Sequence, residues 1–187
     1  MATIDEFLAD ASHRMDKSVE AAHHEFNTVR TGRASSALLD RIQVEYYGTR
    51  MPLNQIATIN VPEPRMLTIQ PFDPSSIAAI ERTIIESDLG LNPSSDGKVI
   101  RLPIPQLTED RRKELVKVVR KIAEDSRIAV RNVRRDALHH LKELDRAGEA
   151  QADDVHRAEE RVQKLTDEHV KRIDEVLKGK EAEILEV

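Results

Sequence analysis

The sequence predicts an α+β protein in which a three-helix bundle is interrupted by a small inserted β/α/β domain. All eight prolines lie between Pro52 and Pro105, so the first 51 residues and the last 82 contain none. In the two proline-free parts apolar residues recur every three or four positions, which indicates helices. In the proline-containing segment that separates these parts they recur at every second position, which indicates strands. Charged residues make up 34% of the 187 and aromatic residues only 3%, which is typical of a helix-rich protein. We therefore expect residues 1–31 and 106–187 to form the bundle and residues 32–105 the inserted domain.

The first predicted helix begins after Thr3, a candidate N-cap. Asp5 and Glu6 then occupy the first turn, where the helix dipole favours negative charge. We expect the helix to end at Thr31-Gly32. Its apolar face consists of Ile4, Leu8, Ala11, Met15, Val19, Ala22, Phe26 and Val29.

Short β-prone runs at 42–46, 56–61, 66–70 and 99–102 predict the strands of the inserted domain. Asp73-Pro74 predicts an N-cap followed by proline at the first helical position, and Gly90 predicts the end of that helix. The expected apolar stripe of the helix is Ile77, Ile80, Ile84 and Ile85.

Two long helices follow, one capped by Thr108 and continuing to a turn near Gly148, the other starting at Asp153. Amphipathic helices of this kind bury their apolar stripes by packing together as a bundle. We expect the first to bury Leu115, Val119, Ile122, Ser126, Ala129, Val133, Ala137, Leu141 and Leu144. We expect the second to bury Val155, Ala158, Val162, Leu165, His169 or Val170, Ile173 and Leu177, with His169 as a hydrogen-bonded histidine and not a metal ligand.

Positive charge is concentrated in one segment, although the whole chain has a formal net charge of −5. Residues 111–135 contain ten basic and three acidic residues, a net charge of +7. Lys113, Lys117, Arg120, Arg127 and Arg131 each lie two residues before an expected core position, with Arg134 and Arg135 following. Because two residues are about 200° of helix rotation, we expect these cations to form one row that points away from the core. A solvated helix face with surface ion pairs is the alternative, but three acids compensate only part of the row.

The row favours an anionic partner, because arginine binds phosphate through a planar fork of donors. Structured RNA is the preferred partner, since it is recognised largely through backbone and shape. The scarcity of aromatic side chains argues against recognition of single strands by stacking.

Other functional classes are disfavoured. The chain has no cysteine, which excludes disulfides, thiolate catalysis and zinc sites with sulfur ligands. The adjacent pairs His23-His24 and His139-His140 point about 100° apart on a helix, a poor arrangement for one metal ion. No nucleotide-binding or hydrolase motif is found, and no secretion signal or membrane-spanning run. We expect a cytoplasmic protein without enzymatic activity, metal, cofactor or membrane partner.

The inserted domain is joined to the bundle by two stretches of chain, near Thr31-Gly32-Arg33 and near Pro103-Ile104-Pro105. A glycine-containing strand beside a proline-stiffened one suits a restricted hinge at Thr31, Gly32, Pro103 and Pro105. An ordinary domain junction has the same pattern.

Five motifs occur in order: VRTGRA at 29–34, VEYYG at 44–48, SDLGLNP at 87–93, LTEDRRKEL at 107–115 and VRNVRRDA at 130–137. Together they resemble the bacterial ribosome recycling factor family over essentially the whole chain. The resemblance implies an L-shaped two-domain molecule that splits the post-termination ribosome into subunits, together with elongation factor G and GTP. A helical adaptor or co-chaperone that binds an acidic protein is the alternative function.

The resemblance also implies which residues act. Large-subunit ribosomal RNA is bound by arginines that match Arg30, Arg131 and Arg134, and we expect Arg33, Arg127 and Arg135 to support them. The inserted domain is the part that pivots and meets the elongation factor. We expect a monomer that does not bind DNA, and we expect Arg134→Ala to weaken ribosome binding while changing stability by only a few tenths of a kcal/mol.

Overall fold

The computed structural model describes residues 3–186, which divide into two compact units. Among these residues, one unit contains 3–31 together with Glu109–Glu186, and the other contains Gly32–Thr108. The second boundary therefore falls after Thr108 and not after Pro105.

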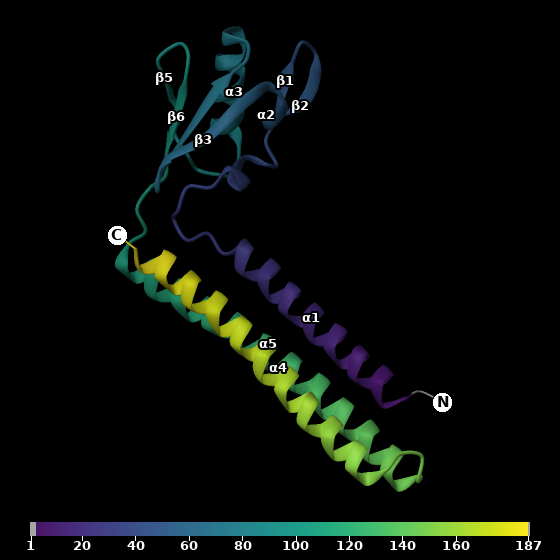
Figure 1. The fold of residues 1–187 in the computed structure, drawn as a ribbon. Coiled ribbons are helices and arrows are strands. Elements are labelled where there is room, and N and C mark those ends of the chain that lie inside the picture. Colours follow the sequence, from purple (N-terminus) through teal and green to yellow (C-terminus); the bar gives the residue numbers. More distant parts are fainter. Residues whose placement is uncertain (1–2, 187) are drawn as a thin grey trace. The chain divides into compact units, whose positions relative to one another are not determined.

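The first unit is a bundle of three helices, α1 (Ile4–Thr28), α4 (Glu109–Arg146) and α5 (Ala152–Leu185). Each helix packs against the other two, and Figure 1 shows α4 and α5 side by side along their lengths. The predicted bundle is thus confirmed. Its largest fully buried side chains are Phe26, Met15, Leu141 and Ile173.

The N-terminus of α1 is held by the predicted cap. The Thr3 backbone N–H donates to Glu6 Oε2 at 2.6 Å, and the Glu6 N–H donates to Thr3 Oγ1 at 3.3 Å, a complete capping box. The helix ends at Thr28, before the expected stop at Thr31-Gly32. Phe26 is the last buried residue of the helix, and Val29 is its C-cap with an extended backbone (φ −79°, ψ 115°).

The buried stripe of α4 differs from the expected one near its middle. Ala123 and Val130 are completely buried, whereas the expected Ile122 and Ala129 are only partly buried. Ser126 and Leu144 are also only partly buried. The buried face is therefore offset by one residue at two positions in the middle of α4, which packs against both α1 and α5. This offset changes how far the nearby basic side chains lie from the core.

The second unit contains a four-stranded antiparallel sheet in the order β3 (Ala57–Glu63), β4 (Met66–Pro71), β6 (Ile100–Pro103), β5 (Ser94–Ser95). A separate hairpin of β1 (Gln43–Tyr46) and β2 (Thr49–Pro52) precedes it, followed by a single turn of helix, α2 (Leu53–Ile56). The four predicted strands correspond to β1, β3, β4 and β6. The short β2 and β5, and α2, were not predicted from the sequence pattern.

Helix α3 (Ile77–Glu86) packs its apolar face into the core of this second unit. Asp73 caps the preceding 3-10 turn, Pro74–Ser76, by accepting from the Ser75 N–H at 2.9 Å, as predicted. Ile77, Ile80 and Ile84 are buried, but Ile85 is 62% exposed because it lies a quarter-turn away from that face. The helix ends at Glu86, four residues before Gly90, with Ser87 as its C-cap.

Candidate nucleic-acid interface

The basic segment 111–135 lies within α4, and its cations do not form one row. Arg120, Arg127 and Arg134 are seven residues apart and contact side chains of α5. We call these three the seam arginines. Because the buried positions are Ala123 and Val130, Arg120 and Arg127 lie three residues before the core, which is about 60° away around the helix. The prediction that these cations point away from the core is therefore wrong for the seam arginines.

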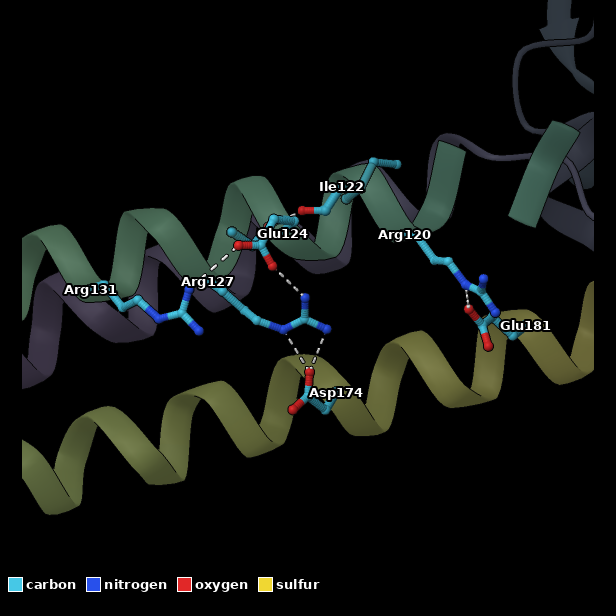
Figure 2. A network of polar contacts seen from close by, with 8 residues as sticks. Arg120, Ile122, Glu124, Arg127, Arg131, Asp174 and Glu181 are labelled. Carbon is cyan, nitrogen blue, oxygen red and sulfur yellow. Dashed lines mark hydrogen bonds and ion pairs between the residues drawn. The ribbon is translucent and has the colours of Figure 1, made fainter. Parts of the chain in front are cut away.

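Arg127 is largely enclosed, with 19% of its side chain exposed. Its Nε donates to Asp174 Oδ1 of α5 at 2.8 Å, its Nη2 lies 2.7 Å from the same oxygen, and its Nη1 donates to Glu124 Oε2 at 2.8 Å (Figure 2). Burial disfavours the charge, but the hydrogen bonds that Arg127 donates to Asp174 and Glu124 outweigh it and raise the pKa of Arg127. Arg127 thus joins α4 to α5 as a permanent cation.

The other two seam arginines have different partners. Arg120 Nε donates to Glu181 Oε1 at 2.6 Å, and this hydrogen bond raises the pKa of Arg120 (Figure 2). Arg134 Nη1 donates to the neutral amide oxygen of Gln163 at 3.1 Å, and its Nε is buried without a hydrogen-bond partner among the described residues. Arg134 therefore keeps a charge that its α5 partner does not neutralise.

The solvent side of α4 carries a second set of cations, Lys117, Lys121, Arg131 and Arg135, which we call the outer cations. All four are exposed, with 47% of the Arg131 side chain and 78% of the Lys121 side chain accessible. Lys121 pairs with Asp125 at 2.7 Å, and Arg135 donates to the Asn132 side chain. Within residues 3–186, Lys117 makes no hydrogen bond or ion pair. Lys117, Arg131 and Arg135 belong to the predicted row and face solvent as expected, whereas Lys121 was not predicted to be part of it.

Glu124 lies between the two sets. Its Oε2 accepts from Arg127, and its Oε1 accepts from Arg131 Nη1 at 3.4 Å (Figure 2). Half of the Glu124 side chain is exposed, at 51%. Glu124 is one of the three acids expected to compensate part of the basic segment, and its spacing of three and seven residues places it on the same helix face as Arg127 and Arg131.

Of the six predicted RNA-binding arginines, four lie on α4 and two elsewhere. Arg131 and Arg135 are on the solvent side, and Arg127 and Arg134 are on the α5 side. Arg30 is exposed on the coil that follows the C-cap of α1, and Arg33 is exposed in the other unit.

The predicted hinge residues lie on two linkers. Thr31 Oγ1 donates to Glu183 Oε2 of α5 at 3.3 Å, and the Ala34 N–H donates to Pro64 O at 2.7 Å, so Gly32 and Arg33 form the connection between two anchored points. Gly32 has φ +76°, and a Cβ built there would lie 2.9 Å from Leu107 Cγ. The position therefore requires glycine.

In the second linker, Pro103 is the last residue of β6 and is paired with Met66. The Ile104 N–H donates to Arg65 O at 2.8 Å, which continues the ladder. Pro105 lies beyond this contact. Pro103 is thus part of the sheet, and Pro105 begins the linker to α4.

His169 is buried, as expected for a hydrogen-bonded core histidine. Its Nδ1 lies 2.6 Å from Leu165 O and its Nε2 lies 3.0 Å from Asp16 Oδ1 of α1. Asp16 Oδ1 also accepts from Arg172 Nη1 at 2.8 Å, and that hydrogen bond, followed by the one from His169, lowers the pKa of Asp16. Across residues 3–186, no group of three or more potential metal ligands is found.

No helix in the described part of the chain has the length and hydropathy needed to cross a membrane. The structure defines the class of protein as a two-unit α+β protein with a basic helix face. It combines a three-helix bundle, an inserted unit with a small antiparallel sheet, and a segment of net charge +7 on one bundle helix.

Comparison with known proteins identifies the family. Residues 22–185 match the family model described as ribosome recycling factor. The chain is 59% identical to the ribosome-recycling factor of Rubrobacter xylanophilus over 96% of its own length and 97% of the relative's. It is 54% identical to that of Bacillus subtilis, over 97% and 98% of the two chains. The chain belongs to the ribosome recycling factor family.

Solved structures agree with this assignment. A solution structure of a ribosome recycling factor is 43% identical, with a TM-score of 0.76 and complete coverage of both chains. A second match, at 47% identity and a TM-score of 0.66, covers 98% of this chain and 100% of the other. It belongs to models for the T. thermophilus ribosome recycling factor and the E. coli elongation factor G bound to the E. coli post-termination complex.

Proposed function

We propose that this protein releases ribosomes from mRNA after termination, by splitting the post-termination complex into subunits together with elongation factor G and GTP. Family membership supports this function, as does the similarity to a recycling factor placed with elongation factor G on the ribosome. The protein acts in the cytoplasm as a monomer. GTP hydrolysis belongs to the elongation factor, so the protein itself is not an enzyme and requires no cofactor.

The observation that carries the RNA-binding part is the set of outer cations on α4. Arg131 and Arg135 present exposed guanidinium groups, which bind phosphate of large-subunit ribosomal RNA. Arg134 adds positive charge that Gln163 does not neutralise. Arg127 supports the site indirectly, because its ion pair with Asp174 holds α4 against α5.

Arg30 and Arg33 lie on either side of Thr31-Gly32, and each contributes an exposed guanidinium group that binds phosphate. With the bundle anchored by phosphate contacts, the elongation factor meets the inserted unit and moves it about the linkers at Thr31-Gly32 and Pro105. Pro103 limits this motion by keeping the end of β6 in the sheet. The rigid bundle transmits the strain to the contacts between the subunits.

The test is to incubate the protein with purified post-termination ribosomes, elongation factor G and GTP, and to score free subunits by light scattering and gradient sedimentation. Subunit release that requires all three components is the expected result. Arg131→Ala should lower the ribosome affinity about 5–8-fold at 0.1 M salt, the loss of about one phosphate contact. Arg157→Ala is the matched control, because Arg157 on α5 is 72% exposed and pairs only weakly, at 3.9 Å, with Asp154.

An absence of subunit release with the wild-type protein would contradict the proposal. Ribosome binding that responds equally to Arg131→Ala and Arg157→Ala would contradict the assignment of the α4 surface. Indifference to ribosomes combined with binding to an acidic protein would instead support the adaptor function.

A further inference from the structure

We infer that Glu124 is an internal competitor for RNA phosphate, and that it makes the basic surface of α4 selective for ribosomal RNA over other RNA. The inference rests on the proposed function, because it concerns the same surface. It assigns a specificity-determining role to an acidic residue in the segment 111–135, where the proposed RNA-binding residues are cations.

The first argument is that Glu124 is fixed in position. Its Oε2 accepts from Arg127 Nη1 at 2.8 Å, the distance of a strong charge-assisted hydrogen bond. Arg127 is in turn held by Asp174 of α5 at 2.7 Å and is largely enclosed. The carboxylate is therefore tied to the seam between two helices, and it cannot swing away from the surface when a polyanion approaches.

The second argument is that the contact with Arg131 is exchangeable. Glu124 Oε1 lies 3.4 Å from Arg131 Nη1, well beyond the range of a strong ion-pair hydrogen bond. Arg131 is 47% exposed, so its guanidinium already faces water. An incoming phosphate oxygen can replace Oε1 at Arg131 while Glu124 stays on Arg127.

The consequence concerns selectivity. A fixed carboxylate beside Arg131 repels any phosphate and compensates part of the charge that would attract it. An RNA that offers one or two phosphates gains little free energy when a phosphate oxygen replaces Glu124 Oε1 at Arg131. A folded RNA that meets Arg131, Arg135 and Lys117 together gains enough contacts to outweigh it. Glu124 thus suppresses weak, non-specific binding more than it suppresses binding to the ribosome.

The experiment uses the full-length protein and a fluorescently labelled single-stranded uridine 12-mer as the non-specific probe, with 50S subunits as the specific one. Glu124→Gln keeps the shape of the side chain and removes its charge. We expect it to raise affinity for the 12-mer about 5-fold at 0.1 M salt and to steepen the dependence of log K on log salt by about 0.7, the contribution of one phosphate contact. Affinity for the 50S subunit should change less than 2-fold.

The matched control is Glu143→Gln, the same change on the same helix at a residue that is 57% exposed and whose side chain, within residues 3–186, pairs only with His139 and His140. It should leave both affinities unchanged. In an Arg131→Ala background, Glu124→Gln should lose most of its effect, because the competition is for Arg131.

An unchanged affinity of Glu124→Gln for the 12-mer would overturn the inference, as would an equal increase for Glu143→Gln, which would reflect net charge alone. Weaker binding of both probes would assign Glu124 to positioning the arginines and would also overturn it. The subunit-splitting assay with the wild-type protein is scored separately. A failure there contradicts the proposed function, whereas normal splitting with an unaltered RNA preference contradicts only the role of Glu124.

Discussion

Arg127 and Arg131 lie four residues apart on the same helix, and the structure predicts opposite consequences of replacing them. Arg127 donates one hydrogen bond to Asp174 of α5 and one to Glu124 of its own helix, with only 19% of its side chain exposed. Arg131 has one long contact with Glu124 and is 47% exposed. Stability should therefore depend on Arg127, and RNA binding should depend directly on Arg131.

The magnitude follows from the environment of each side chain. Hydrogen bonds to charged groups contribute about 1.5–3 kcal/mol, and the carboxylates left behind by Arg127→Ala are half exposed and can be rehydrated, so we expect a loss of about 2 kcal/mol. In a chain of this length that loss lowers the melting temperature by about 4–8 °C. Arg131→Ala should change the stability by less than about 0.5 kcal/mol.

The assay is thermal unfolding followed by the helical circular dichroism signal, which comes mostly from the bundle, combined with sedimentation on 50S subunits. Arg127→Ala should unfold at a lower temperature and keep most of its ribosome affinity below that temperature. Arg131→Ala should melt like the wild type and bind several-fold more weakly. Equal melting temperatures for the two variants would refute the assignment of Arg127 to the seam between the helices.

Three further predictions concern other parts of the molecule. Gly32→Ala should destabilise the protein by about 1–2 kcal/mol, because φ is +76° there and the new methyl group would meet Leu107. Gly179→Ala in α5 should raise the stability by about 0.8–1 kcal/mol, because no atom lies within 4 Å of the new methyl group. Urea unfolding measures both changes. The hydrogen bond from Arg172 lowers the pKa of Asp16 and so stabilises the folded state. This contribution is present above the ordinary carboxyl pKa of about 4 and is lost as the pH falls through the lower pKa of the folded state. Asp16→Asn should therefore be less stable than wild type at pH 7 and should lose less stability on acidification, as measured by melting between pH 7 and pH 2. Thr3→Ala removes the capping box and should cost about 1 kcal/mol, seen as faster amide exchange in the first turn of α1.

Local patterns were sufficient for much of the fold. The 3.6-residue period predicts all three bundle helices, and the Thr3 and Asp73 caps are confirmed because a cap depends on residues next to each other in the chain. The two-residue strand β5 was missed, because a pairing with β6 leaves no periodic signal in so short a segment. Ile85 was expected to be buried and is not, because the width of the buried face of α3 depends on the sheet beneath it.

The concentration of positive charge in residues 111–135 is a property of the sequence, and so is its arginine-rich character. Sequence spacing placed those cations on one face, but an error of one residue in a buried position moves the expected core direction there by about 100° around the helix. The position of α5 decided that Ala123 and Val130 face the core and that Arg120 and Arg127 meet acids on the neighbouring helix. The amino-acid sequence by itself thus determined that α4 is a basic amphipathic helix. Only the packing of three helices decided which cations contact α5 and which face solvent alone, because the rotation of a helix about its axis is set by its neighbours.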